Sequence, residues 1–190
     1  MKVAAIGLVV TCCSCAMSAP PAHAPEVPSA LLVGSQGEAL DARALVATAP
    51  LTVLVFFSPD CHCLSAHEPR LLALFGAYHP RGVQFVMVDS EARGSLAQDA
   101  AEARARAYPF PILRDRGAKL ADALGAEYAS YTVVVDSRAR VRYRGGIDSD
   151  KSHMHENATA YLRDALDDLL ADREPRITEG KTLGCSLQKW

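Results

Sequence analysis

The sequence predicts an α/β domain with a central mixed sheet flanked by helices. Two observations lead to this fold class. Strands of the buried type alternate with helical segments along most of the chain, and the last two strands follow one another directly. The alternation indicates parallel neighbours at the centre of the sheet, and the consecutive pair indicates an antiparallel edge. With 190 residues, 49% of them hydrophobic, the chain has the size and composition of one ordinary domain.

The predicted elements begin with two apolar strands that enclose a helix. Leu51 to Phe57 is a continuous apolar run, typical of a strand buried on both faces, and Val83 to Val88 has the same character. Residues 64–79 between them carry apolar side chains at helical spacing, and Pro69 predicts a late start or a kink. Helices are then expected at 96–108, 117–124 and 160–170, and strands at 112–113, 131–135 and 141–144.

The N-terminal segment has the pattern of an export signal. Met1-Lys2 precedes an apolar run from Val3 to Val10 that is too short to remain as a membrane span, and small residues follow it. Cleavage is expected after Ala16 or Ser18. Alternatively, one of three early cysteines receives a lipid, as in bacterial lipoproteins; these are Cys12, Cys13 and Cys15. We therefore expect a periplasmic protein, or one anchored by lipid to a bacterial membrane and facing the periplasm.

The rest of the chain is expected to divide into three parts. A Pro-rich linker continues the signal segment of residues 1–24 to about residue 30, a single domain covers 31–173, and a tail without clear periodicity covers 174–190 and carries Cys185. Export places the remaining thiols where disulfides can form and persist. The formal charge of −2 gives no electrostatic case for nucleic acid, and contact with a membrane is expected only through a lipid anchor.

The residues most suited to chemistry lie where the first predicted strand meets the following helix. Cys61 and Cys63 stand at this junction, which is where open α/β sheets place reactive groups. Unpaired N–H groups and the helix dipole favour a thiolate there. A protonated His62 would favour the thiolate further, whereas Asp60, a candidate N-cap of the helix, would oppose it.

Several motifs in order resemble a known family. They are LTVLVFFSPDC, the PRL of residues 69–71, RGVQFVMVD, YPFPILRD, VVVDSRARVRYRGGID and the LGCS of residues 183–186. Together they resemble the thioredoxin-like superfamily, and within it the exported bacterial redoxins of the alkyl hydroperoxide reductase/thiol-specific antioxidant family. The resemblance implies a thioredoxin-like fold and a thiol oxidoreductase with Cys61 as the reactive sulfur. It also implies a protein disulfide or a peroxide as substrate, an external thiol as reductant, and no organic cofactor.

The sequence departs from this family at three places. Thioredoxins use Cys-x-x-Cys, whereas Cys61 and Cys63 form Cys-x-Cys, and Ser130 stands near the position of the expected cis-proline. Peroxiredoxins have a proline and a threonine ahead of the cysteine. Here Ser58 can stand for the threonine, but Leu54 occupies the proline position. These departures favour dithiol chemistry over peroxidase activity.

Two cysteines compete as the resolving partner of Cys61. Residues two apart on a regular helix point in nearly opposite directions, so Cys63 can pair with Cys61 only if the first turn is irregular. Cys185 can do so only if the tail docks near the helix start. Proximity in the chain favours Cys63.

Two other functions fit the same residues. A copper-binding or copper-delivery protein, similar to the Sco chaperones, would use Cys61 and Cys63 with His62 or His67 as ligands. His153 and His155 are interpreted as solvated loop residues and His67 as a helix-surface residue. A non-catalytic interaction domain stapled by a disulfide is the third hypothesis.

Overall fold

A computed structural model describes residues 25–189. The expected signal segment, with its three cysteines and its cleavage sites, lies outside the described residues. Within the described part, no helix is long and apolar enough to cross a membrane.

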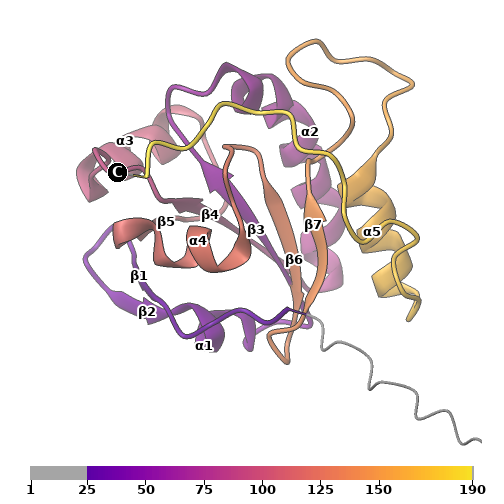
Figure 1. Cartoon of the computed structure of the whole chain (residues 1–190), viewed down its shortest axis with the longest axis horizontal. Helices are drawn as coiled ribbons and strands as arrows, with labels where there is room; N and C mark the ends of the chain where they lie inside the picture. Colours follow the sequence, from indigo (N-terminus) through magenta and orange to yellow (C-terminus); the bar gives the residue numbers. More distant parts are fainter. Residues whose placement is uncertain (1–24, 190) are drawn as a thin grey trace, which may run out of the picture.

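One seven-stranded mixed sheet forms the centre of the molecule (Figure 1). Its order is β2-β1-β5-β4-β3-β6-β7. The strands are β1 (Leu31–Val33), β2 (Ala39–Asp41), β3 (Leu51–Phe57), β4 (Val83–Asp89), β5 (Ile112–Asp115), β6 (Thr132–Asp136) and β7 (Val141–Gly145). The central strands β3, β4 and β5 run parallel, and β6 and β7 form the predicted antiparallel edge. The short β1 and β2 add a second antiparallel edge that was not predicted.

Helices cover both faces of the sheet, with α2 behind it and α4 in front in Figure 1. They are α1 (Ala42–Val46), α2 (His62–Tyr78), α3 (Leu96–Ala105), α4 (Lys119–Leu124) and α5 (Tyr161–Leu170), with 3₁₀ turns at His79–Arg81 and Arg116–Ala118. The α2 helix begins at His62 and continues through Pro69, so the late start predicted from this proline does not occur. Every residue of β3 is buried, as its apolar run predicted.

The expected linker belongs to the folded body at least from Pro25 onward. Val27 is fully buried and donates its backbone N–H to the Ala139 carbonyl at 2.8 Å. The Pro25 carbonyl accepts the N–H of Val141 at 2.8 Å, so this segment runs beside the β6–β7 turn. A boundary at about residue 30 is therefore too late.

The C-terminal tail folds back across the sheet instead of extending away from it. Figure 1 shows it leaving α5, passing the ends of β7 and β6 and crossing near the start of α2. Gly180 donates to the Arg144 carbonyl at 2.9 Å, and further along an isolated antiparallel bridge joins Ser186 to Tyr128. The tail therefore crosses the end of the sheet at which the parallel strands finish.

Candidate functional site

Cys61 occupies the N-cap of α2, immediately after the loop that follows β3. Its backbone is extended, with φ −83° and ψ 104°, and its Sγ accepts the N–H of Leu64 at 3.4 Å. Cys61 thus takes the capping position that was expected for Asp60. On a regular helix, side chains two residues apart point in nearly opposite directions. This rule does not apply to Cys61 and Cys63, because Cys61 precedes the helix and only Cys63 lies in its first turn.

Backbone pairing holds Cys185 beside these two cysteines. The Cys185 carbonyl accepts the N–H of Ala129 at 2.9 Å, and Leu187 donates to the Glu127 carbonyl at 2.9 Å. Leu187 is buried, and Lys189 forms ion pairs with Asp122 and Glu127 at 2.8 and 2.9 Å. Hydrogen bonds, apolar burial and charge pairing together keep the tail in this place.

The three sulfurs form one cluster. The Sγ atoms of Cys61, Cys63 and Cys185 all lie within 4.8 Å of one another, and all three residues are free thiols in this structure. Cys61 and Cys63 are almost completely buried, whereas Cys185 is only partly covered. The structure therefore brings together both candidate partners of Cys61, and Cys185 is the most accessible of the three.

The surroundings of the cluster shift the pKa values of the three thiols in different directions. Burial, reinforced by the neighbouring Cys185, raises the pKa of Cys61 to about 11 and also raises that of Cys63. Burial opposes ionisation of Cys185 too, but hydrogen bonds from the Cys61 thiol and from the backbone N–H groups of Cys63 and His62 outweigh it and lower its pKa. The start of α2 therefore stabilises a thiolate on Cys185 more than on Cys61.

The three residues expected to tune Cys61 lie around it in different ways. The Ser58 carbonyl accepts the Cys61 N–H at 3.2 Å, which shapes the turn before the helix. Asp60 and His62 are exposed, and the His62 ring contacts the Asp60 carbonyl at 3.1 Å. His62 thus acts on the cluster through its backbone N–H, whose hydrogen bond helps to lower the pKa of Cys185.

Ser130 stands where the sequence comparison expected a cis-proline. No cis peptide bond occurs in residues 25–189, and Ser130 has a left-handed backbone with φ 73°. A side chain at Gly184 would meet the Ala129 carbonyl at 2.1 Å and the Ser130 Oγ at 3.0 Å. The tail therefore needs a glycine at 184 to bring Cys185 close to the sheet.

His67 is buried, so its interpretation as a helix-surface residue is wrong. Its Nδ1 contacts the Cys63 carbonyl at 2.7 Å, and its Nε2 contacts the Asp148 carboxylate at 3.1 Å. A carbonyl and a carboxylate are both acceptors, so this pair of contacts favours the protonated imidazole, in which both ring nitrogens donate. Burial alone would lower the His67 pKa, but its hydrogen bonds to Asp148 and Cys63 raise it.

Arg70 extends this network to the loop between β7 and α5. Its guanidinium donates to Asp148 at 2.6 Å, to Asp150 at 2.9 Å and to the His155 carbonyl at 2.6 Å. His155 and His153 are exposed, as predicted. Both ring nitrogens of His67 are engaged in hydrogen bonds, so it is not placed to act with the cysteines as the metal ligand that was considered. His62 contacts the Asp60 carbonyl instead of a sulfur.

An open cavity of about 430 Å³ adjoins the loop before Cys61. It is lined by Ser58, Pro59, Asp60, Glu91, Ala92, Arg93, Gly94, Gln98 and Gln188. The loops after β3 and β4 and the tail all contribute to this lining. The cavity thus lies at the carboxyl ends of parallel strands, where α/β sheets bind their ligands.

Comparison with protein families identifies the group to which this chain belongs. The Redoxin family model matches residues 21–162, more than half of the chain. The chain is a member of the Redoxin family. Membership supports a thioredoxin-like, thiol-based redox function, in agreement with the cysteine cluster. No curated protein matches the sequence significantly.

Solved structures confirm the thioredoxin-like fold. An uncharacterized conserved protein from Geobacillus kaustophilus is 26% identical with a TM-score of 0.78, covering 89% of this chain and 92% of its own. A hypothetical protein from Sinorhizobium meliloti is 23% identical with a TM-score of 0.78, and the match covers 90% of this chain and 96% of that protein. A secreted Mycobacterium tuberculosis disulfide oxidoreductase homologous to E. coli DsbE is 18% identical with a TM-score of 0.50. That match covers 60% of this chain and 80% of the oxidoreductase.

Proposed function

We propose that this redoxin is an exported thiol–disulfide oxidoreductase whose redox centre is the cluster of Cys61, Cys63 and Cys185. The convergence of the three sulfurs within 4.8 Å carries the proposal. Disulfide exchange needs a thiolate and a second thiol within reach of it. The cluster offers both without an organic cofactor.

Cys185 is the sulfur best placed to attack a substrate. It is the most accessible thiol of the cluster, and the hydrogen bonds of Cys61, Cys63 and His62 lower its pKa. Its thiolate attacks one sulfur of a substrate disulfide, the substrate S–S bond breaks, and the other substrate sulfur leaves as a thiolate. Cys185 is then joined to the substrate as a mixed disulfide.

Cys61 is the thiol best placed to resolve the mixed disulfide. Of the two buried thiols, Cys61 contributes the stronger hydrogen bond to the Cys185 thiolate. The Cys61 sulfur in turn accepts a hydrogen bond from the Cys185 backbone N–H. After losing its proton, Cys61 attacks the Cys185 sulfur, the second substrate thiolate leaves, and a Cys61–Cys185 disulfide remains. The protein has then given two electrons to the substrate, and an external dithiol returns them by the same exchange. This sequence differs from the one implied by resemblance, in which Cys61 attacks first.

A protein disulfide fits the site better than a peroxide. Leu54 stands at the position where peroxiredoxins have a proline and is buried within β3, so this part of the peroxidase pattern is missing from the strand before the cluster. The cavity beside Ser58 and Asp60 provides room for a peptide segment along the loop that leads to Cys61. If a peroxide is used, its O–O bond is cleaved by the Cys185 thiolate, giving an alcohol and a sulfenic acid that Cys61 converts to the same disulfide with loss of water.

Turnover by cysteine variants tests this proposal. The full chain with Cys12, Cys13 and Cys15 changed to Ser serves as the parent, so that only the three cluster thiols remain. The assay follows reduction of insulin disulfides with dithiothreitol as electron donor. Cys185→Ser and Cys61→Ser should each lose at least about 100-fold in rate, while Cys63→Ser keeps most of it. Undiminished turnover by both Cys185→Ser and Cys61→Ser would exclude a catalytic cluster and favour a disulfide-stapled interaction domain.

The same parent distinguishes the two substrate classes. Cumene hydroperoxide replaces insulin in a parallel assay with the same reductant. We expect the rate with the protein disulfide to exceed the rate with the peroxide. The reverse order would assign the chain to the thiol peroxidases.

A further inference from the structure

The three cysteines also have the arrangement of a small metal site. A metal bound equally to three sulfurs, with bonds of about 2.3 Å, places those sulfurs about 4 Å apart. The observed Sγ atoms lie within 4.8 Å of one another, so small changes of side-chain torsion would reach that spacing. Two segments far apart in the sequence, the start of α2 and the tail, supply these sulfurs.

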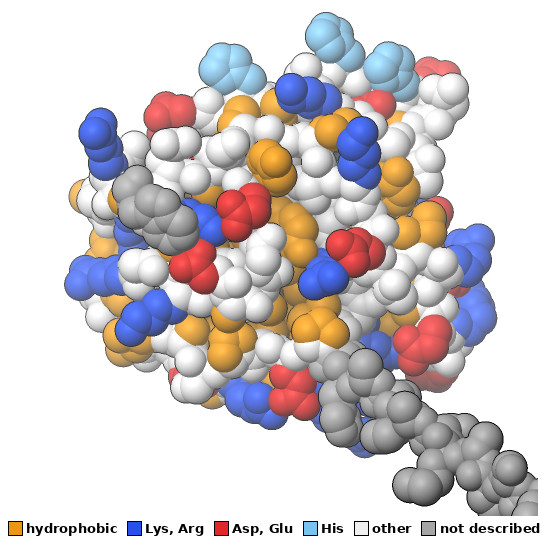
Figure 2. Space-filling model, viewed as in Figure 1, with side chains coloured by type: hydrophobic (Ala, Val, Ile, Leu, Met, Phe, Trp, Pro, Cys, Tyr) orange, Lys and Arg blue, Asp and Glu red, His pale blue; other side chains and the backbone are white. Residues whose placement is uncertain are grey.

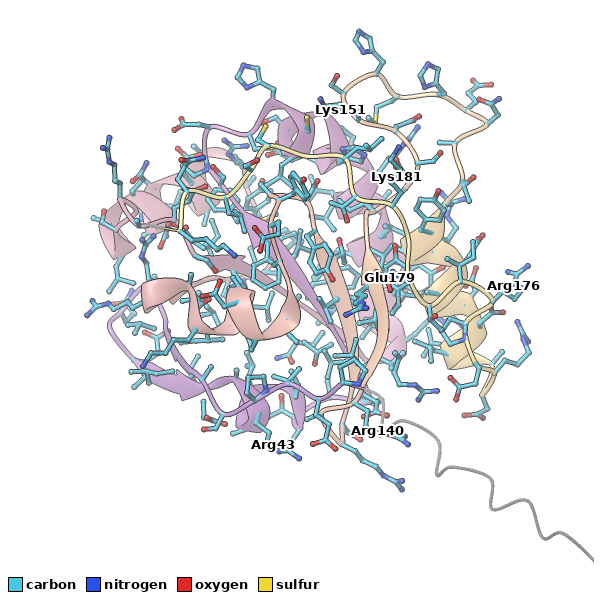
Figure 3. The ribbon with its side chains drawn as sticks, viewed as in Figure 1. Arg43, Arg140, Lys151, Arg176, Glu179 and Lys181 are labelled. Atoms are coloured by element: carbon cyan, nitrogen blue, oxygen red, sulfur yellow. The ribbon has the colours of Figure 1, made fainter. Side chains whose placement is uncertain are left out.

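Backbone N–H groups and one lysine lie near the sulfurs of the cluster. The Leu64 N–H points at Cys61, and the N–H groups of His62 and Cys63 face Cys185. Lys151 lies on the loop after β7, near the start of α2, and its charge favours the thiolate of Cys63 (Figure 3). Figure 2 shows three histidines along this upper edge of the molecule, with both basic and acidic side chains close to them. A metal-bound thiolate of the cluster would therefore face these backbone donors and Lys151.

The ligand set favours a soft monovalent ion. Zn²⁺ usually takes four ligands in a closed site, but among the described residues only these three cysteines form a group of potential ligands within 4.8 Å. His67 is directed toward Asp148 and the Cys63 carbonyl. Thiolate sulfur selects Cu(I), which has a filled d shell and accepts three ligands readily.

We propose that Cys61, Cys63 and Cys185 together bind one Cu(I) ion through their three sulfurs. Binding releases the remaining thiol protons to water and changes no oxidation state. Because the same sulfurs form the disulfide, the metal-bound and oxidised states exclude one another. In this site Cys185 takes the place that a histidine would have in a Sco-like site.

Competition for Cu(I) tests this proposal in the full chain. The parent again has Ser at positions 12, 13 and 15, because the early cysteines would bind copper themselves. Reduced protein is titrated anaerobically with Cu(I) against the coloured chelator bathocuproine disulfonate. We expect one Cu(I) per chain, held against the chelator, and X-ray absorption showing three sulfur ligands. Each single change among Cys61→Ser, Cys63→Ser and Cys185→Ser should weaken binding at least about tenfold.

Two further variants distinguish the proposed ligands from the alternatives. His153→Gln changes an exposed histidine of the loop and should leave the affinity unchanged. His62→Gln should do the same, because the exposed His62 ring contacts the Asp60 carbonyl and not a sulfur. Circular dichroism confirms that each variant is folded. Unchanged affinity in folded Cys185→Ser, loss of affinity in His62→Gln, or removal of all Cu(I) by the chelator would overturn the proposal. Insulin turnover in the absence of copper is independent of each of these outcomes.

Discussion

The sulfur of Cys185 lies within 4.8 Å of the sulfur of Cys61, although one residue belongs to the C-terminal tail and the other caps α2. Two backbone N–H groups at the start of α2 face Cys185, while Cys61 is buried behind it. The positive end of the helix thus acts on a cysteine brought to it by the tail. In the proposed mechanism, this relationship makes Cys185 the thiol that attacks first.

The first prediction concerns the order of alkylation. Reduced parent protein treated briefly with iodoacetamide at neutral pH should be labelled first at Cys185, because its pKa is lowered while that of Cys61 is raised to about 11. Peptide mapping by mass spectrometry measures the labelling at each cysteine. Faster labelling of Cys61 than of Cys185 would contradict the assignment.

The second prediction concerns the docking of the tail. Leu187 is buried, and its replacement by Ala should weaken docking by about 2 kcal/mol. Cys61 would then be exposed more often, and its alkylation should become at least tenfold faster. Ile177→Ala is the matched control, since Ile177 lies in the same tail but is exposed. Equal alkylation rates in the two variants would show that docking of Leu187 does not shield Cys61.

The third prediction concerns His67, whose pKa is raised by Asp148 and by the Cys63 carbonyl. The folded state holds this proton more tightly than the unfolded state, so the stabilisation is fully present below about pH 6.5, the ordinary histidine pKa. It is lost as the pH rises through the higher folded pKa. His67→Gln should cost about 3–5 kcal/mol in the free energy of unfolding at low pH, because it breaks a buried pair.

Urea unfolding of parent and His67→Gln across a pH series measures this difference. The gap between the two proteins should shrink as the pH rises above 6.5. His153→Gln, at an exposed position, should show no such trend. A gap that is constant or that widens with pH would contradict a protonated His67.

The fourth prediction concerns Asp99, which is buried beside Asp89 and Arg114. Burial, together with its interaction with Asp89, raises the Asp99 pKa to about 8. Between about pH 4 and pH 8 the unfolded chain has released this proton and the folded chain has not, so stability falls as the pH rises. Asp99→Asn removes this effect, and its free energy of unfolding relative to the parent should increase across the same interval. No change with pH would show that Asp99 is ionised in the folded state.

The sequence was sufficient for the centre of the fold and for the position of Cys61 and Cys63. Apolar runs such as Leu51–Phe57 are long enough to identify buried strands, whereas the three-residue β1 and β2 have too little pattern. Cys61 and Cys63 lie at the junction of β3 and α2 in both the prediction and the structure. The sequence could not decide where Cys185 lies. Backbone pairing at Tyr128 and the burial of Leu187 hold the tail in place, and neither feature produces a periodic pattern in the sequence.

His67 shows a second limit of the sequence. A histidine in a helix that also carries charged residues is usually predicted to lie on the surface. The burial of His67 depends instead on its contact with Asp148, which Arg70 also holds. Asp148 lies in an irregular loop far along the chain, so no local spacing connects it to His67. The same limit explains the N-cap of α2, where Asp60 is the common residue type but Cys61 occupies the position.

Disulfide mapping of the oxidised protein tests the central claim most directly. The parent with only three cysteines is isolated under oxidising conditions, digested and analysed by mass spectrometry before and after mild treatment with glutathione. We predict a Cys61–Cys185 disulfide that glutathione reduces, with Cys63 as the free thiol. A Cys61–Cys63 disulfide with free Cys185, or a bridge that resists glutathione, would contradict the account.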